Sequence, residues 1–154
     1  MNTKITDLEP KIVWKYFEEL TKIPRPSKKE HKVAAYLIDF AEKHKLDYKQ
    51  DEVGNVLITR PAAKGFENRK TVCLQSHMDM VCEKNTDKDF DFEKDPIQTY
   101  VDGEWLTADG TTLGADDGIG VATSLAILSS KDIKHGEVEC LFTVDEETGL
   151  SGAF

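Results

Sequence analysis

Three short polar segments contain the residues that could carry out chemistry. The first, QSHMDMV, places His77 and Asp79 two positions apart, so both side chains share a face if the chain is extended. A neutral imidazole is a good zinc ligand, and a nearby carboxylate can fix its tautomer and raise its basicity. The alternative, a histidine satisfied by a local hydrogen bond, is the commoner outcome for an isolated H-x-D pattern.

The second segment, GADDGIGVATSLAIL, has two carboxylates directly before a helix of small and apolar residues. Because a helix N-terminus attracts negative charge, Asp116 or Asp117 could simply be a cap. The glycines lack the spacing of a phosphate-binding loop, and two aspartates would repel a phosphate. Glycines among acids are better explained by close backbone packing beside a cation.

The third segment, VDEETG, follows an apolar run and contains Glu146 and Glu147. Neighbouring residues on a strand point to opposite sides, so these two glutamates are expected to have different tasks. One could bind a metal while the other faces the reacting water, and the preceding Asp145 is given no chemical role. An ordinary acidic turn after a strand is the alternative.

The elements that must position these segments are alternating helices and strands. This alternation predicts an α/β fold with three α/β/α layers, in which a mixed sheet lies between helices. An S-x-x-E pattern at Ser27 and Glu30 predicts a capping box that opens the second helix. The expected helices cover residues 8–20, 27–44 and 118–128; the expected strands cover 47–52, 55–59, a segment from 71 and 138–144, with a hairpin in TYVDGEWLTA.

The polar segments are expected to meet at one edge of this sheet. Open α/β sheets bind ligands at the carboxyl ends of their strands. Gathering Asp79, Asp116, Glu146 and Glu147 in one cleft would be strongly unfavourable without compensating positive charge. A divalent cation, or a pair of cations sharing one carboxylate, supplies that charge. Histidine with carboxylates suits Zn²⁺, Mn²⁺ or Co²⁺.

Composition limits the class of protein. A chain of 154 residues that is 39% hydrophobic can bury one core. Its net charge of -9 disfavours nucleic acid and anionic membranes as partners. Three cysteines, an odd number, indicate reduced thiols, and the N-terminal residues have no apolar segment of signal-peptide length. We therefore expect a soluble cytoplasmic protein.

The segments SHMDMV, GTTLGADDGIGVA and DEETGLSGA, in this order and at this spacing, resemble the dinuclear zinc peptidase family of aminoacylases, glutamate carboxypeptidases and bacterial dipeptidases. Within the family, the likeness is to the subgroup of aminoacyl-histidine dipeptidases, and it runs over the whole chain. The resemblance implies hydrolysis of dipeptides of the Xaa-His type by a water held between two zinc ions, with Co²⁺ or Mn²⁺ as alternatives. Another amidohydrolase of the family, an aminoacylase or a tripeptidase, is the alternative function.

The resemblance also implies a role for each polar residue. His77 would bind one metal, Asp116 would bridge both metals, and Glu147 would bind the other. Asp79 would orient and polarise the histidine, and Glu146 would be the general base. The peptide bond after Asp116 would be cis, as is typical of the family.

In length, the sequence departs from the family. Family members are much longer, and two further metal ligands and a lid domain that often dimerises would lie beyond residue 154. We therefore expect residues 1–154 to be the N-terminal part of the catalytic domain, inactive by itself, of a protein that acts on small peptides as a homodimer. A non-catalytic domain that binds a metal or a partner is the alternative for the chain alone.

Overall fold

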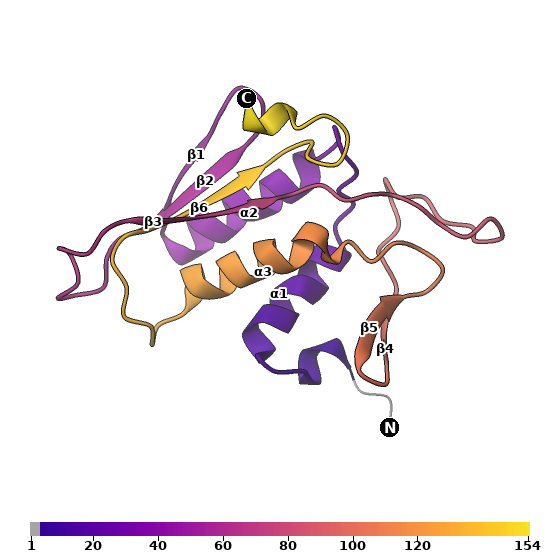
Figure 1. Cartoon of the computed structure of the whole chain (residues 1–154), viewed down its shortest axis with the longest axis horizontal. Coiled ribbons are helices and arrows are strands. Elements are labelled where there is room, and N and C mark those ends of the chain that lie inside the picture. The colour runs from indigo at the N-terminus through magenta and orange to yellow at the C-terminus, as the bar shows by residue number, and fades with distance from the viewer. Residues whose placement is uncertain (1–3) are drawn as a thin grey trace.

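A computed structural model describes residues 4–154, in which helices and strands alternate (Figure 1). The helices are the short 3₁₀ turn η1 (Ile5–Asp7), α1 (Lys11–Thr21), α2 (His31–His44), α3 (Ala115–Ser129) and the 3₁₀ turn η2 (Ser151–Ala153). The strands are β1 (Asp47–Gln50), β2 (Val56–Arg60), β3 (Val72–His77), β4 (Thr99–Asp102), β5 (Trp105–Ala108) and β6 (Val138–Thr143).

The two N-terminal helices form where apolar residues recur at the helical period. In α1 this pattern buries Tyr16, Phe17 and Leu20 on one face. The helix starts at Lys11, directly after Pro10, whose extended backbone forms the N-cap. The helix α2 starts at His31, four residues after Ser27, so the predicted capping box is wrong. The side chains of that pattern bind elsewhere, as described below.

The four-stranded sheet is mixed and has the order β1–β2–β6–β3. The strand β6 runs antiparallel to β2 and parallel to β3, and this parallel pair places His77 opposite Thr143. The chain connects β3 to β6 through the antiparallel hairpin β4–β5 and then α3, as expected for a parallel pair. The predicted α/β class with a mixed sheet is confirmed.

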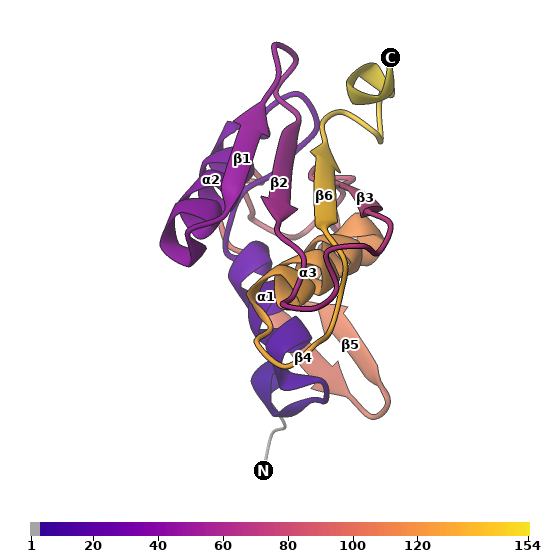
Figure 2. The ribbon, with the colours of Figure 1, turned by 90° about the vertical axis from the view of Figure 1, so that its left-hand side faces the viewer.

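One face of the sheet carries the hydrophobic core. Alternate residues of β2 and β6 point into it, and the helices α1, α2 and α3 contribute to the same cluster. In Figure 2 the strands β1, β2, β6 and β3 lie side by side in this order, with α2 behind β1. On the opposite face, Leu57 and Leu141 are half-buried, while Cys73 and Gln75 are exposed. Residues 4–154 therefore supply the sheet and one of the expected helical layers.

No helix among residues 4–154 has both the length and the apolar character needed to cross a membrane.

Candidate metal centre

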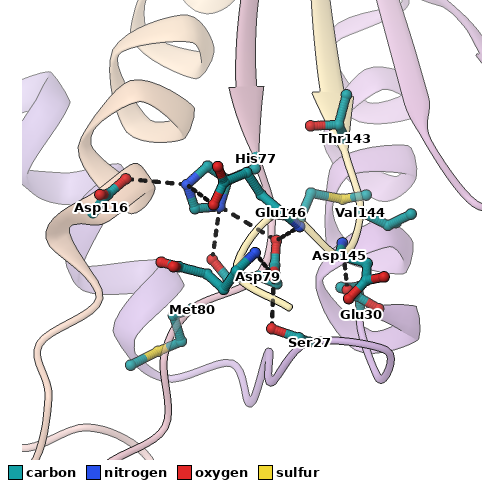
Figure 3. Close-up of polar contacts among 12 residues, drawn as sticks. Ser27, Glu30, His77, Asp79, Met80, Asp116, Thr143, Val144, Asp145 and Glu146 are labelled. Atoms are coloured by element: carbon teal, nitrogen blue, oxygen red, sulfur yellow. Dashed lines mark hydrogen bonds and ion pairs between the residues drawn. The ribbon is translucent and has the colours of Figure 1, made fainter. Parts of the chain in front are cut away.

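The ends of β3 and β6 bring the first and third polar segments together. The strands β3 and β6 are parallel and pair as far as His77 and Thr143, so both strands end at the same edge of the sheet. The backbone N–H of Met78 donates to the carbonyl oxygen of Thr143 at 2.8 Å, one residue past the last strand pair. The segments His77–Asp79 and Asp145–Glu147 consequently lie side by side (Figure 3).

His77 is buried and its two ring nitrogens face different partners. Nδ1 lies 3.2 Å from the carbonyl oxygen of Asp79 and 3.3 Å from its Oδ1, while Nε2 lies 3.0 Å from Oδ1 of Asp116. Burial lowers the pKa of His77, but the hydrogen bonds with Asp79 and Asp116 outweigh burial and raise that pKa to about 9. With Nδ1 occupied by Asp79, Nε2 is the nitrogen available to a metal.

The second polar segment reaches the same place because α3 begins beside the end of β3. Asp116 and Asp117 have non-helical backbone angles within the first turn of α3, and the peptide bond between them is cis, as the resemblance implies. The carboxylate of Asp117 turns back to accept a hydrogen bond from the N–H of Gly120 at 3.1 Å. Asp117 is therefore a local helix cap, whereas Asp116 points to His77 (Figure 3).

Asp79 connects the first polar segment to the third. Its side chain is fully buried and accepts hydrogen bonds from Ser27 Oγ at 2.6 Å and from the backbone N–H groups of Glu146 and Glu147 at 3.1 Å each. Burial raises the pKa of Asp79, yet the bonds from His77, Ser27 and the two N–H groups outweigh burial and hold its pKa below the usual range. Asp79 therefore stays ionised and orients both the imidazole and the loop after β6.

The residues predicted as metal ligands converge. His77, Asp116 and Glu147 each offer one ligand atom, and these atoms all lie within 4.8 Å of one another. Oε2 of Glu146 lies 3.9 Å from Nε2 of His77, at the border of this group. Burial raises the pKa of Glu147, and the negative charges of the neighbouring carboxylates act in the same direction. One imidazole and two carboxylates are donors that zinc accepts, so the residues present fit a zinc-type ion.

The centre is open to solvent on one side. The side chain of Asp116 is 87% exposed and that of Glu146 is 41% exposed, whereas the side chain of His77 is only 8% exposed. A ligand can thus reach the carboxylates directly. Residues 4–154 do not enclose the centre on that side.

The sequence reasoning missed the supporting residues before α2. Ser27 donates to Asp79, and Oε1 of Glu30 accepts from the backbone N–H of Asp145 at 2.9 Å and from that of Lys28 at 2.9 Å. The S-x-x-E pattern was a real signal of paired polar side chains, but its partners are the ends of β3 and β6 and not the helix. Asp145 is also buried, and its carboxylate accepts hydrogen bonds from Thr148 and Ser151.

The expected close packing of glycines beside a cation has a specific cause. A Cβ atom added to Gly114 would lie 2.5 Å from Nη2 of Arg25, and one added to Gly118 would lie 2.7 Å from the same atom. The cation against these glycines is therefore a guanidinium. A buried arginine in the run IPRPS has no periodicity or spacing that reveals it in the sequence.

Comparison with known proteins agrees with this geometry. The model of the peptidase family M20/M25/M40 matches residues 73–154, the part of the chain that contains all three polar segments. The chain belongs to this family. The resemblance stated from the motifs is therefore confirmed at the level of the family.

Individual relatives extend the likeness to almost the whole chain. The cytosol non-specific dipeptidase of Escherichia coli (strain K12) is 48% identical over 152 residues, which cover 99% of this chain and 31% of that protein. The crystal structure of an aminoacylhistidine dipeptidase from Vibrio alginolyticus superimposes with a TM-score of 0.97 at 53% identity, over 99% of this chain and 31% of that one. This chain thus spans about a third of the length of both relatives.

A tripeptidase from Staphylococcus aureus is more distant. Its crystal structure has a TM-score of 0.75 at 28% identity and covers 92% of this chain and 38% of its own. Both crystal structures share the fold of this chain, and the dipeptidase is the more similar of the two.

Proposed function

We propose that this chain is the N-terminal part of the catalytic domain of a metal-dependent dipeptidase. The observation that carries the proposal is the convergence of His77, Asp116 and Glu147 at one edge of the sheet, with Glu146 beside them. The ion would be zinc, with Co²⁺ or Mn²⁺ as alternatives, and two ions would bind in the whole protein. The names of the relatives support dipeptides as the substrate class.

The proposed ligand roles are those that the resemblance implies, and the positions of these side chains are compatible with them. Nε2 of His77 would hold one ion, Glu147 would hold the other, and Asp116, with its exposed side chain, would bridge them. Bound metal ions would polarise the scissile carbonyl and lower the pKa of a water. Asp79 would hold the imidazole through Nδ1 and so keep Nε2 directed at its ion.

Glu146 would move the proton. Its carboxylate lies next to the ligand group but is not needed to hold an ion, so it can accept the proton of the attacking water and deliver it to the departing amine. Its backbone N–H is bound to Asp79, and this hydrogen bond limits how far the residue can shift from the ligands.

The proposed substrates are dipeptides, including those that end in histidine. A tripeptidase or an aminoacylase is the second candidate, because a tripeptidase has the same fold at lower identity. A panel of dipeptides, tripeptides and N-acyl amino acids, given to the whole protein, separates these functions. Preference for tripeptides or acyl amino acids would replace the dipeptidase assignment.

The base assignment is tested by Glu146→Ala in the whole protein. We expect turnover to fall by at least about 10²-fold, because the acceptor of the water's proton is lost, while zinc stays bound. The matched control is Glu139→Ala, which removes a half-buried glutamate near the start of β6, at the end of the strand away from the centre, and which should leave turnover unchanged. Retained activity in Glu146→Ala, with zinc content unchanged, would refute the assigned base.

For the chain of 154 residues by itself, we propose weak metal binding and no peptidase activity. The open side of the centre supports this view, since solvent reaches Asp116 and Glu146 freely. Zinc calorimetry and a dipeptide assay on this chain test it, and tight binding with turnover would contradict it. We further propose that the whole protein is cytoplasmic and homodimeric.

A further inference from the structure

Arg25 lies between the two segments that supply the proposed histidine and bridging aspartate ligands. Its side chain is buried, and the residue is 2% exposed. Nη1 donates to the carbonyl oxygens of Met78 and Asp79 at 3.0 Å each, and Nη2 donates to the carbonyl oxygen of Gly114. One guanidinium thus joins the backbone just after β3 to the backbone just before α3.

The surrounding backbone is shaped to hold this guanidinium. Gly114 and Gly118 leave it space, because a Cβ atom at either position would come within 2.7 Å of Nη2. Such a contact is too close for any side chain without a shift of the guanidinium or of the helix.

The backbone of the arginine is itself anchored to the segment that follows β3. The carbonyl oxygen of Arg25 accepts a hydrogen bond from the N–H of Met80 at 3.1 Å, and Pro26 forms a parallel bridge with Met80. The residue therefore contacts this segment through both its main chain and its side chain. Only the side chain extends to the start of α3.

The charge of Arg25 is also placed among acids. Burial lowers the pKa of Arg25 to about 10, while the negative charges of Asp79, Asp117 and Glu147 and the Cys82 thiol act in the opposite direction. The guanidinium therefore remains a cation at neutral pH. The guanidinium is bound by three carbonyl oxygens, and within residues 4–154 it forms no ion pair with a carboxylate, so its charge acts on the acidic group as a whole.

We propose that Arg25 is a positioning residue of the metal centre, which fixes the separation between His77 and Asp116. Met78 follows the histidine directly, and Gly114 precedes the aspartate by two residues, so the three carbonyl contacts set how the two ligands approach each other. Their present distance is 3.0 Å between Nε2 and Oδ1. The inference rests on the proposed function, since it assigns Arg25 to the geometry of that same centre.

Arg25→Lys in the whole protein tests this role. Lysine keeps the charge but cannot replace a planar fork that reaches three carbonyl oxygens in two segments. We expect zinc affinity, measured by competition with a chromophoric chelator, to fall by about 10- to 100-fold. The absorption spectrum of the Co²⁺-substituted protein should change as well, because it reports ligand geometry directly, which a loss of stability alone does not alter.

A second variant reaches the same contact without changing Arg25. Gly118→Ala places a Cβ atom 2.7 Å from Nη2 of Arg25 and 3.0 Å from Cε2 of Phe17, so it should displace the guanidinium and produce the same direction of change in zinc affinity and in the Co²⁺ spectrum. If Arg25→Lys does not fold, Gly118→Ala tests the positioning role in its place. The matched control is Arg60→Lys, because Arg60 also donates to a backbone carbonyl of α3, that of Ile127, at the opposite end of the helix.

The outcomes separate the inference from the proposed function. If the unaltered protein neither binds zinc nor hydrolyses dipeptides, the proposed function fails and the role of Arg25 fails with it. Suppose instead that the unaltered protein binds zinc and hydrolyses dipeptides. If Arg25→Lys or Gly118→Ala then has the same zinc affinity and Co²⁺ spectrum as the control Arg60→Lys, only the positioning role is overturned. Weaker zinc binding with an altered spectrum, absent from the control, supports it.

Discussion

At the scale of single residues, Asp79 does more than orient a histidine. Its two carboxylate oxygens accept hydrogen bonds from Ser27 and from the N–H groups of Glu146 and Glu147, in addition to the contact with His77. The carboxylate therefore sets the position of the proposed ligand His77, at the end of β3, and of the loop that follows β6. Both oxygens already accept hydrogen bonds, so neither could be replaced by a group that donates one.

We accordingly predict that Asp79→Asn weakens zinc binding by the whole protein about 10- to 100-fold. The new amide nitrogen would face N–H or O–H donors, so both the imidazole and the loop after β6 would shift. Calorimetric titration with zinc measures the change.

The control for this prediction is Asp51→Asn. The carboxylate of Asp51 likewise accepts backbone hydrogen bonds, from Val53, Gly54 and Asn55, but it lies in the turn between β1 and β2. The substitution Asp51→Asn should lower the free energy of unfolding by about 1 kcal/mol and leave zinc affinity unchanged. Equal zinc affinities in the two variants would show that Asp79 has no special relation to the metal.

At the scale of elements, the ends of β3 and β6 and the start of α3 are held by the segment before α2. Glu30, which is 7% exposed, accepts the backbone N–H of Asp145 and so ties this segment to the loop after β6. The link spans 115 residues of sequence. It is this contact, and not a helix cap, that explains the burial of Glu30.

Glu30→Ala should therefore destabilise the chain by about 1–3 kcal/mol, because the buried N–H of Asp145 loses its partner. Urea denaturation of the chain measures the effect. The matched control is Glu42→Ala in α2, the helix that follows Glu30; it removes an exposed side chain that accepts a hydrogen bond from the hydroxyl of Tyr48, and it should change stability by less than about 0.5 kcal/mol. Similar losses in both variants would contradict a structural role for Glu30.

The same elements show what the sequence could and could not predict. The mixed α/β fold, the hairpin β4–β5 and the helix α3 follow from alternation, turn residues and periodicity, which are local signals. The meeting of the three polar segments is expected because open α/β sheets bind ligands at the carboxyl ends of their strands, whereas the choice of His77, Asp116 and Glu147 as ligands is what the family resemblance implies. The contacts of Arg25, Ser27 and Glu30 depend on which segments are neighbours in space, and nothing in the local pattern fixes that.

At the scale of the whole molecule, the sheet has one covered and one open face. The side chains of Cys140 and Leu74, opposite each other in the register, point towards the helices, and Cys140 is fully buried near Ser124 of α3. Cys73 is the neighbour of Leu74 on β3, so it points to the other face, where it is exposed. The two thiols therefore report separately on the two faces.

Thiol labelling at pH 8 should accordingly modify Cys73 first and Cys140 only after unfolding. Burial raises the pKa of Cys140 to about 11, and burial likewise raises the pKa of the half-buried Cys82 to about 11. At pH 8 only about one thiol in a thousand is then the reactive thiolate at these two positions. Raising the pH from 8 to 9 should speed the labelling of Cys82 about tenfold, since its thiolate fraction rises tenfold below the pKa.

Serine variants assign the labelling phases. Cys73→Ser should remove the fast phase, whereas Cys140→Ser should leave it intact and remove the phase that appears only in denaturant. Slow labelling of Cys73 in the native chain would mean that its face is covered, and a dependence of that rate on protein concentration would identify a second copy of the chain as the cover. Half-buried Leu57 and Leu141 lie on this face and would provide the apolar contact for such an association.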